Sequence, residues 1–245
     1  MLPVISLGPL QIPVPQVTLI LSLALGFILA ERWAKRAGLS TQVVSDGLFW
    51  ALVAGIVAAR GMYILRYPGA FRASPWSVLS PNPGLLDPVG GILGAVLFLW
   101  GWSQRKGIAP LQMLDAVTPF LAVVQVGLAL YHAARGSFFG MPASVPWAVT
   151  FLGAARHPTA LYWAALVLGV LGWVVYRLRR RPRHAPGGWV FWPFLAWSAG
   201  VYVFVEGLRG DAQVLANGLR LGHLLALPVL ALALWQWDRL QQKEN

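Results

Sequence analysis

Seven long apolar runs divide the chain, and they restrict its fold more than any other feature of the sequence. They cover residues of about 14–30, 43–65, 87–103, 110–133, 159–176, 188–206 and 221–237. A helix needs about 20 mostly apolar residues to cross the hydrocarbon core of a bilayer. The runs therefore predict an all-α integral membrane protein with seven transmembrane helices, in which residues 1–245 form a single polytopic domain.

The composition agrees with a membrane protein and argues against a nucleic-acid-binding one. Hydrophobic residues make up 58% of the chain and charged residues 11%, against roughly 25% charged in a soluble domain. The net charge is +11, but the cations stand in short spacers between apolar runs rather than on a polar surface. No charge precedes Glu31, so we expect the first run to be a retained helix rather than a cleaved signal peptide.

The sequence gives no reason to expect a metal or a cofactor. It contains no Cys, and its four His lack the spacing of a metal site. We therefore expect no thiolate nucleophile on the protein itself.

The Lys and Arg residues of the spacers predict the orientation, because cytoplasmic loops carry an excess of cations. With the N-terminus outside, the cytoplasmic side holds twelve of the nineteen: Arg32, Lys35, Arg36, Arg105, Lys106, Arg177, Arg179, Arg180, Arg181, Arg183, Arg239 and Lys243. The outer side holds the other seven: Arg60, Arg66, Arg72, Arg135, Arg156, Arg209 and Arg220. The predicted topology has the N-terminus outside and the C-terminus in the cytoplasm. The run RLRRRPRH (177–184) is interpreted as an anchor beside anionic lipid.

This topology brings several ionisable residues to the outer ends of the helices. They are Arg60, His132, Arg135, Arg156, His157, Glu206, Arg209 and His223. Each also has a simpler interpretation, such as an i, i+3 ion pair between Glu206 and Arg209 or a snorkelling Arg60. Together, however, four arginines at one level predict a pocket for an anion, because the guanidinium fork matches phosphate. A lipid headgroup is the anion expected at that depth.

Six short motifs follow one another in an order that matches a known family. They are AARGMY (58–63), VGGILG (89–94), DAVTPFLAVVQ (115–125), PWAV (146–149), RHPTALYWA (156–164) and FVEGLRGDAQ (204–213). In type and spacing they resemble motifs of the bacterial prolipoprotein diacylglyceryl transferases, which are seven-helix proteins of the cytoplasmic membrane. RHPTALYWA, for example, looks like that family's Arg-His-Pro-Thr/Ser-Gln-Leu-Tyr-Glu stretch.

The resemblance implies a reaction and its substrates. These enzymes move a diacylglyceryl group from phosphatidylglycerol to the thiol of the lipobox cysteine of a prolipoprotein, on the outer side of the membrane. The nucleophile belongs to the substrate, which agrees with a chain that has no Cys. The implied partners are phosphatidylglycerol, the lipobox peptide and membrane lipids, with no nucleic acid. The implied location is the bacterial inner membrane, in a multi-pass protein.

The resemblance also implies the site residues. The positions that match the family are Arg60, Gly90, Gly91, Gly136, Gly140, Arg156, His157, Pro158, Tyr162, Glu206 and Arg209. Of these, Arg60, Arg156, Tyr162, Glu206 and Arg209 are expected to bind substrate, together with Arg135. The expected catalytic residues are His132 and His157. Glu206 is expected to orient one of the arginines that hold the phosphate.

Several positions depart from the family pattern. Val89 stands in place of a His, Ala129 and Tyr202 in place of Arg, Trp163 in place of Glu, Ala160 in place of Gln, and His132 in place of Asn. Losing one interaction with the leaving group typically costs roughly 10²–10³ in rate. A neutral imidazole can act as a base near pH 7, so His132 is a candidate replacement.

These departures leave three functions open. The chain could be a divergent transferase, a catalytically degenerate relative that binds phospholipid or a lipoprotein precursor, or a transporter with incidental similarity. A transporter would be expected to show inverted repeats or broken helices, and the sequence shows neither.

Overall fold

The computed structural model describes residues 4–7, 10–80, 82–182 and 184–242. Long helices dominate this part of the chain: α1 (Val14–Ala34), α2 (Thr41–Arg66), α4 (Pro88–Arg105), α5 (Pro110–Arg135), α6 (Thr159–Arg179), α7 (Phe191–Leu208) and α8 (Leu221–Gln242). A short helix, α3 (Pro68–Ala73), and three 3-10 turns, η1 (Lys35–Ala37), η2 (Pro75–Leu79) and η3 (Pro83–Leu85), lie in the connections. Two small antiparallel hairpins, which the sequence did not predict, pair β1 (Val4–Leu7) with β2 (Leu10–Pro13) and β3 (Val149–Phe151) with β4 (Ala154–Arg156).

The described residues contain six helices that are long and apolar enough to cross a membrane, namely α1, α2, α5, α6, α7 and α8. The protein is therefore a mostly helical, multi-pass membrane protein. The expected segment that is not among these six, 87–103, does form a helix of 18 residues, α4, but its last turn is the polar Ser103, Gln104 and Arg105. That α4 also spans the membrane stays a prediction.

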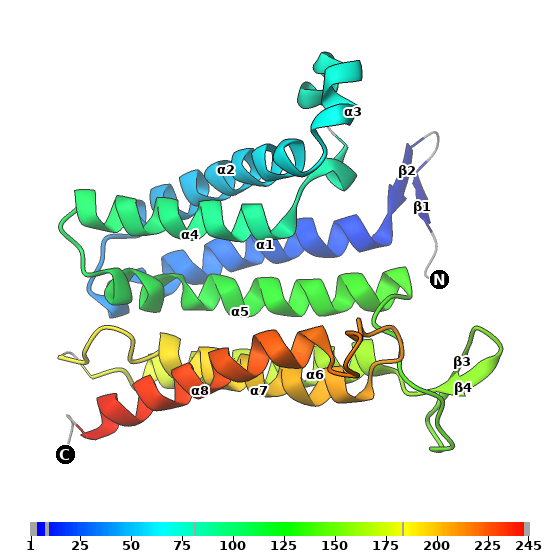
Figure 1. The fold of residues 1–245 in the computed structure, drawn as a ribbon. Helices are drawn as coiled ribbons and strands as arrows, with labels where there is room; N and C mark the ends of the chain where they lie inside the picture. Colours follow the sequence, from blue (N-terminus) through cyan, green and yellow to red (C-terminus); the bar gives the residue numbers. More distant parts are fainter. Residues whose placement is uncertain (1–3, 8–9, 81, 183, 243–245) are drawn as a thin grey trace.

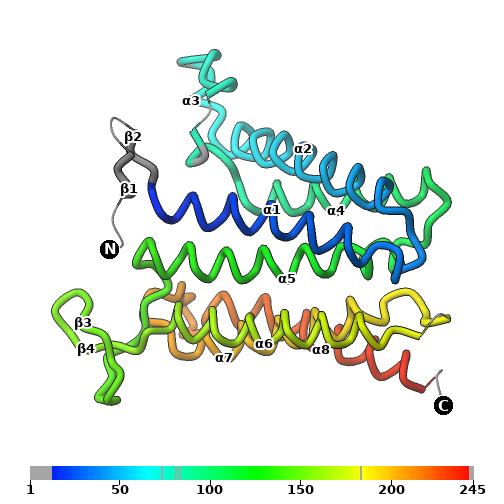
Figure 2. The backbone as a smooth tube through the Cα atoms, turned by 180° about the vertical axis from the view of Figure 1, so that it is seen from behind, coloured from blue at the N-terminus to red at the C-terminus, as the bar shows by residue number. Residues whose placement is uncertain are grey.

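The helices run in alternating directions and form three layers (Figure 1). α1 and α5 lie side by side in the middle, α2 and α4 pack together on one side, and α6, α7 and α8 cover the other. The same layers are seen from behind in Figure 2. All connections therefore gather at two ends of the molecule.

We call these two ends the N-terminal end and the basic end. The N-terminal end carries both hairpins, α3 and the α7–α8 loop, whereas the basic end carries the α1–α2, α4–α5 and α6–α7 connections. Ten of the twelve cations assigned above to the cytoplasmic side lie at the basic end, in the last turns of helices or just after them. The other two, Arg183 and Lys243, lie outside the described residues.

Small residues let the outer helix pair approach closely. Gly90 and Gly94 of α4 face Met62 and Ala58 of α2, and a Cβ on either glycine would collide with those side chains. Interfaces between membrane helices favour such residues, because lipid tails are as apolar as the side chains and close backbone packing is what holds the helices together. The glycine pair of the VGGILG motif therefore has a packing role in this structure.

A buried carboxylate, Asp115 of α5, fixes the start of α7 at the basic end. Its two oxygens accept hydrogen bonds from the backbone N–H groups of residues 188 to 191, over distances of 2.8 to 3.2 Å. Arg181 adds an ion pair of 2.8 Å, and both side chains are almost completely buried. The first N–H groups of a helix lack partners within the helix, so Asp115 satisfies donors that a membrane protein cannot leave bare.

Replacing Asp115 tests this anchoring role. Asp115→Asn removes the charge that balances Arg181 and puts an amide donor next to backbone donors. We expect it to destabilise the protein by about 3 kcal/mol, the usual scale for breaking a buried ion pair. The measurement is thermal unfolding in detergent. Asp46→Asn is the control, because Asp46 is an exposed carboxylate near the same end; equal unfolding of the two variants would contradict the role.

Candidate functional site

A cavity of about 290 Å³ lies at the N-terminal end, where α5 ends and α6 begins. Its walls are mainly apolar and include three aromatic side chains, Phe138, Phe139 and Phe151. Polar groups come from Ser137, Arg156, His157 and Thr159. A concave apolar site with a few converging polar groups is the usual form of a small-ligand pocket, and here a cation stands at the wall.

Arg156 is the cation on the wall of this cavity. Its Nε donates to the carbonyl of Phe151 at 3.1 Å, and its Nη1 donates to the carbonyl of Gly140 at 3.3 Å. The guanidinium lies 5.3 Å from the centre of the Phe139 ring, in a cation–π arrangement. No carboxylate pairs with it within the described residues. Its positive charge is thus held in place but not neutralised.

His157 and Tyr162 form a second polar group beside Arg156. The Nδ1 atom of His157 lies 3.3 Å from the Tyr162 hydroxyl, which also accepts a hydrogen bond of 2.6 Å from Nε1 of Trp147. The backbone of His157 is fixed to Gly140 and Met141 by two hydrogen bonds of 3.1 Å. Gly140 must be glycine here, because a Cβ would collide with His157.

Glu206, Arg209 and Asp211 form a compact charged cluster behind the cavity wall. Arg209 Nη1 lies 2.6 Å from a Glu206 oxygen, and Arg209 Nε lies 3.0 Å from an Asp211 oxygen. Burial alone would lower the pKa of Arg209, but the hydrogen bonds and charges of Asp211 and Glu206 raise that pKa above its ordinary value. Two carboxylates therefore compensate one guanidinium, and this cluster offers little positive charge to an anionic ligand.

The charged cluster holds one wall of the cavity, through Phe138. The Arg209 guanidinium lies 3.7 Å from the centre of the Phe138 ring, and Asp211 accepts the Phe138 N–H at 2.8 Å. The Thr159 hydroxyl donates a hydrogen bond to the Phe138 carbonyl. Phe138 has a φ of 60°, a left-handed conformation that is costly for a side chain of this size. These contacts supply the stabilisation that such a conformation needs.

His132 lies next to the cavity and reaches it through Ser137. The Nδ1 atom of His132 lies 2.8 Å from the Ser137 hydroxyl, and Ser137 lines the cavity. The imidazole packs against Phe138 and Trp163, with ring centres 4.2 and 5.8 Å apart. Within the described residues its Nε2 makes no hydrogen bond. His132 is therefore connected to the cavity by one hydroxyl group.

The remaining candidates lie farther out. Arg135 is exposed at the end of α5, and its Nη1 donates to the Tyr131 hydroxyl at 2.7 Å. Arg60 lies on α2, across the bundle from α6 and α7 (Figure 1), and donates to the backbone carbonyls of Ser80 and Asn82. His223 contacts the Val203 carbonyl at 3.0 Å. The structure thus gathers the candidates of α5, α6 and α7 and leaves Arg60 apart.

Apolar side chains fill the space beside His132. Ala129 and Trp163 belong to one buried cluster with Val126, Val167 and Val205. Tyr202 stands one helical turn before Glu206 on α7, and Val89 is 59% exposed on α4. Sequence reasoning missed Ser137, Phe138 and Asp211. Asp211 stands within the quoted FVEGLRGDAQ motif, two residues after Arg209, and this spacing was the available signal.

Comparison with known proteins gives a consistent result. The family model described as prolipoprotein diacylglyceryl transferase matches residues 3–237. A phosphatidylglycerol–prolipoprotein diacylglyceryl transferase of Rhizobium meliloti (strain 1021) is 32% identical, over 95% of this chain and 89% of its own length. Enzymes of the same name from Shouchella clausii and Ruegeria pomeroyi are 30% and 32% identical, over 98% and 78% of this chain and 90% and 75% of their own lengths.

Proposed function

The chain belongs to the prolipoprotein diacylglyceryl transferase family, and we propose that it transfers a diacylglyceryl group from phosphatidylglycerol to the thiol of a lipobox cysteine. In this reaction the bond between the glyceryl carbon and the phosphate oxygen breaks, and a carbon–sulfur bond forms. Glycerol phosphate leaves, and a base takes up the thiol proton. The observation that carries the proposal is the family match over residues 3–237, together with a cavity of about 290 Å³ that has an uncompensated arginine on its wall.

Arg156 is the residue we assign to the phosphate. It lines the cavity, it has no carboxylate partner within the described residues, and its guanidinium is held by two backbone carbonyls. A preorganised cation stabilises a leaving phosphate without reorganising during the reaction. Arg135 adds positive charge at the outer rim, whereas Arg60, which lies apart on α2, is proposed to contact substrate from that side of the bundle. Glu206 and Arg209 act as positioning residues, because they hold the Phe138 wall.

The thiol proton is assigned to His132, acting through Ser137. A thiol becomes a strong nucleophile only when it is deprotonated. The Ser137 hydroxyl can accept the thiol proton while it passes its own proton to Nδ1 of His132, 2.8 Å away. His157 lies on the cavity wall beside Arg156 and is proposed to donate an N–H hydrogen bond to the leaving phosphate, with Tyr162 holding its ring.

We further propose that the protein lies in the bacterial inner membrane as seven spans, α4 included, with its N-terminal end outside and its basic end in the cytoplasm. The support is the positive-inside rule, because ten of the described cations stand at the basic end. This orientation puts the cavity on the outer side, where lipoprotein precursors emerge.

Single cysteines test this orientation cleanly, because the chain has no Cys of its own. Ser74→Cys lies at the N-terminal end and Gln104→Cys at the basic end, and both positions are exposed. A membrane-impermeant maleimide added to intact spheroplasts should label the first variant and should reach the second only after lysis. The reverse pattern would show that the protein is inserted the other way round.

Phosphatidylglycerol binding tests the role of Arg156. Arg156→Gln keeps hydrogen-bonding capacity but removes the charge, so we expect binding to weaken by about tenfold or more, the scale of one charge-assisted contact. The measurement is a titration of detergent-solubilised protein with short-chain phosphatidylglycerol.

The control for this titration is Arg72→Gln. It removes an equal charge from the exposed α3 segment at the same end of the molecule. If the two variants bind phosphatidylglycerol equally well, the phosphate does not sit at Arg156.

The proposed proton path predicts that His132→Gln and Ser137→Ala lower turnover to a similar extent. Removing a general base typically costs about 10² or more, and each change breaks the same path. The assay follows labelled glycerolipid transferred to a lipobox peptide in detergent micelles, with thermal unfolding as the check on folding. Wild-type rates in both variants would remove His132 and Ser137 from the reaction.

Two observations favour a second candidate function, a relative that binds the phospholipid without transferring it. The side chains beside His132 form an apolar cluster, and the Arg209 charge is compensated by two carboxylates. Such a protein would retain the Arg156-dependent binding but give no product. The same transfer assay with wild-type protein separates the two functions, and so does restoration of lipoprotein modification in cells depleted of their own transferase.

A further inference from the structure

A groove between α1 and α6 at the basic end has no role in the function proposed above. It has a volume of about 480 Å³ and is lined by Leu29, Arg32, Trp33, Arg36, Val175 and Arg179. We call it the basic groove. α1 and α6 both pack against α5, which leaves this groove between their last turns. It therefore opens where the helices leave the membrane at the basic end.

The three arginines of the basic groove have no carboxylate beside them that would balance their charge, among the residues that the structure describes. No carboxylate forms an ion pair with Arg32, Arg36 or Arg179 within the described residues. Arg36 is positioned, because its Nη1 donates to the Arg179 carbonyl at 2.7 Å and its guanidinium lies 5.2 Å from the centre of the Trp33 ring. Three cations at one narrow site repel each other, so an anion bound among them would relieve that repulsion.

Apolar side chains form the rest of the groove. Trp33 is only 9% exposed, and its ring lies beside the Arg36 guanidinium. Leu29 and Val175 offer an apolar wall to a hydrocarbon chain attached to the anionic group.

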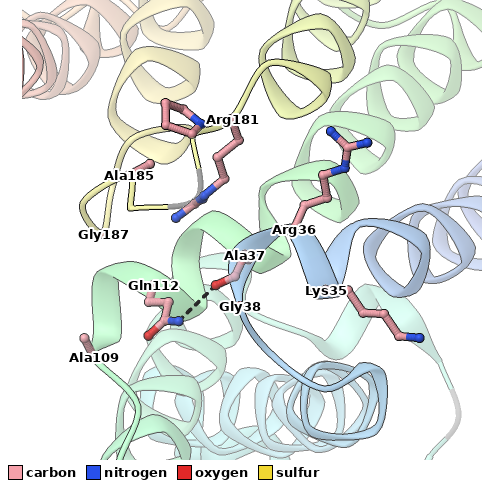
Figure 3. Close-up of a pocket in the computed structure, with 10 residues that line it drawn as sticks. Lys35, Arg36, Ala37, Gly38, Ala109, Gln112, Arg181, Ala185 and Gly187 are labelled. Atoms are coloured by element: carbon pink, nitrogen blue, oxygen red, sulfur yellow. Dashed lines mark hydrogen bonds between the residues drawn. The ribbon is translucent and has the colours of Figure 1, made fainter.

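A neighbouring pocket at the same end is less suited to an anion. In Figure 3, the Arg36 guanidinium points away from Arg181 and Gln112. Arg181 is neutralised by Asp115, and Gln112 donates to the Ala37 carbonyl at 2.9 Å. Lys35 also lines that pocket and has no carboxylate partner within the described residues, but its side chain points away from Arg181 and Gln112 (Figure 3). The cluster of three arginines without carboxylate partners lies in the basic groove.

We propose that the basic groove is a binding site for an anionic glycerophospholipid, separate from the cavity at the N-terminal end. The phosphate lies among Arg32, Arg36 and Arg179, and an acyl chain follows Leu29 and Val175. This assignment does not depend on the transferase reaction, because the groove and the cavity lie at opposite ends of the bundle.

The test uses a phosphatidylglycerol with a photoreactive diazirine near the ester end of one acyl chain. Purified protein in detergent is irradiated with this probe at subsaturating concentration, and the labelled peptides are mapped by mass spectrometry. Wild-type protein should be labelled on α1 and α6 at the basic end. A phosphatidylcholine probe, which has no net charge, should label these peptides far less.

The decisive variant is Arg36→Gln combined with Arg179→Gln. An arginine near an anionic lipid surface contributes about fivefold to binding, so losing two should weaken labelling at the groove by roughly thirtyfold. Arg105→Gln with Lys106→Gln is the matched control, because it removes two charges from the same end but outside the groove. Equal labelling of the two double variants would overturn the proposal.

A competition experiment separates a lipid from a soluble phosphate ester. Unlabelled phosphatidylglycerol should displace the probe, whereas glycerol 1-phosphate should not, because it lacks the acyl chain that the apolar wall contacts. Displacement by both at similar concentrations would overturn the assignment to a lipid.

Discussion

The carboxylate of Asp115 sets the position of α7, and much of the rest of the molecule follows from that position. It accepts four backbone hydrogen bonds at the start of α7 and pairs with Arg181. α5, which carries Asp115, lies in the middle layer of the bundle (Figure 1). The first turn of α7 is thus hydrogen-bonded to the central helix α5, and the last turn of α7 places Glu206 at the opposite end of the bundle. A bilayer gives no water to unpaired helix ends, so such a tie is a requirement of the membrane as well as of the fold.

The arginines at the N-terminal end divide into two groups according to what compensates them. Arg209 is held between Glu206 and Asp211, and its bonds stabilise the Phe138 wall. Within the described residues, Arg156 and Arg135 contact backbone carbonyls, a hydroxyl and aromatic rings and have no carboxylate partner. A compensated guanidinium gives rigidity, whereas an uncompensated one can still attract an anion. Residue type and membrane depth do not distinguish these two uses, but the neighbouring carboxylates do.

The sequence predicted the elements well and the site less well, for one physical reason. An apolar run such as 159–176 must be helical to satisfy its backbone in a membrane, and the structure has α6 at Thr159–Arg179. The ends of the apolar runs also predict how deep a residue lies in the membrane, and they put Arg60 and Arg156 at one level. Lateral position depends on how helices pack, and α2 and α6 lie on opposite sides of α1 and α5. The left-handed Phe138 and its bond to Asp211 depend on the same packing.

The apolar cluster beside His132 bears on the positions where the resemblance implies a charge and this chain has none. The resemblance implies an arginine at Ala129 and a glutamate at Trp163, and both positions lie in one buried cluster. Losing a single member of a buried pair leaves an uncompensated charge and is strongly destabilising, whereas replacing both by well-packed apolar groups is often neutral or favourable. Trp163 stacks on Phe138 with 5.1 Å between ring centres, so the larger side chain also supports the cavity wall. In the proposed function, the chemistry relies on the charges that remain uncompensated around the cavity, so Arg156 is the proposed contact of the phosphate and His132, through Ser137, is the proposed base.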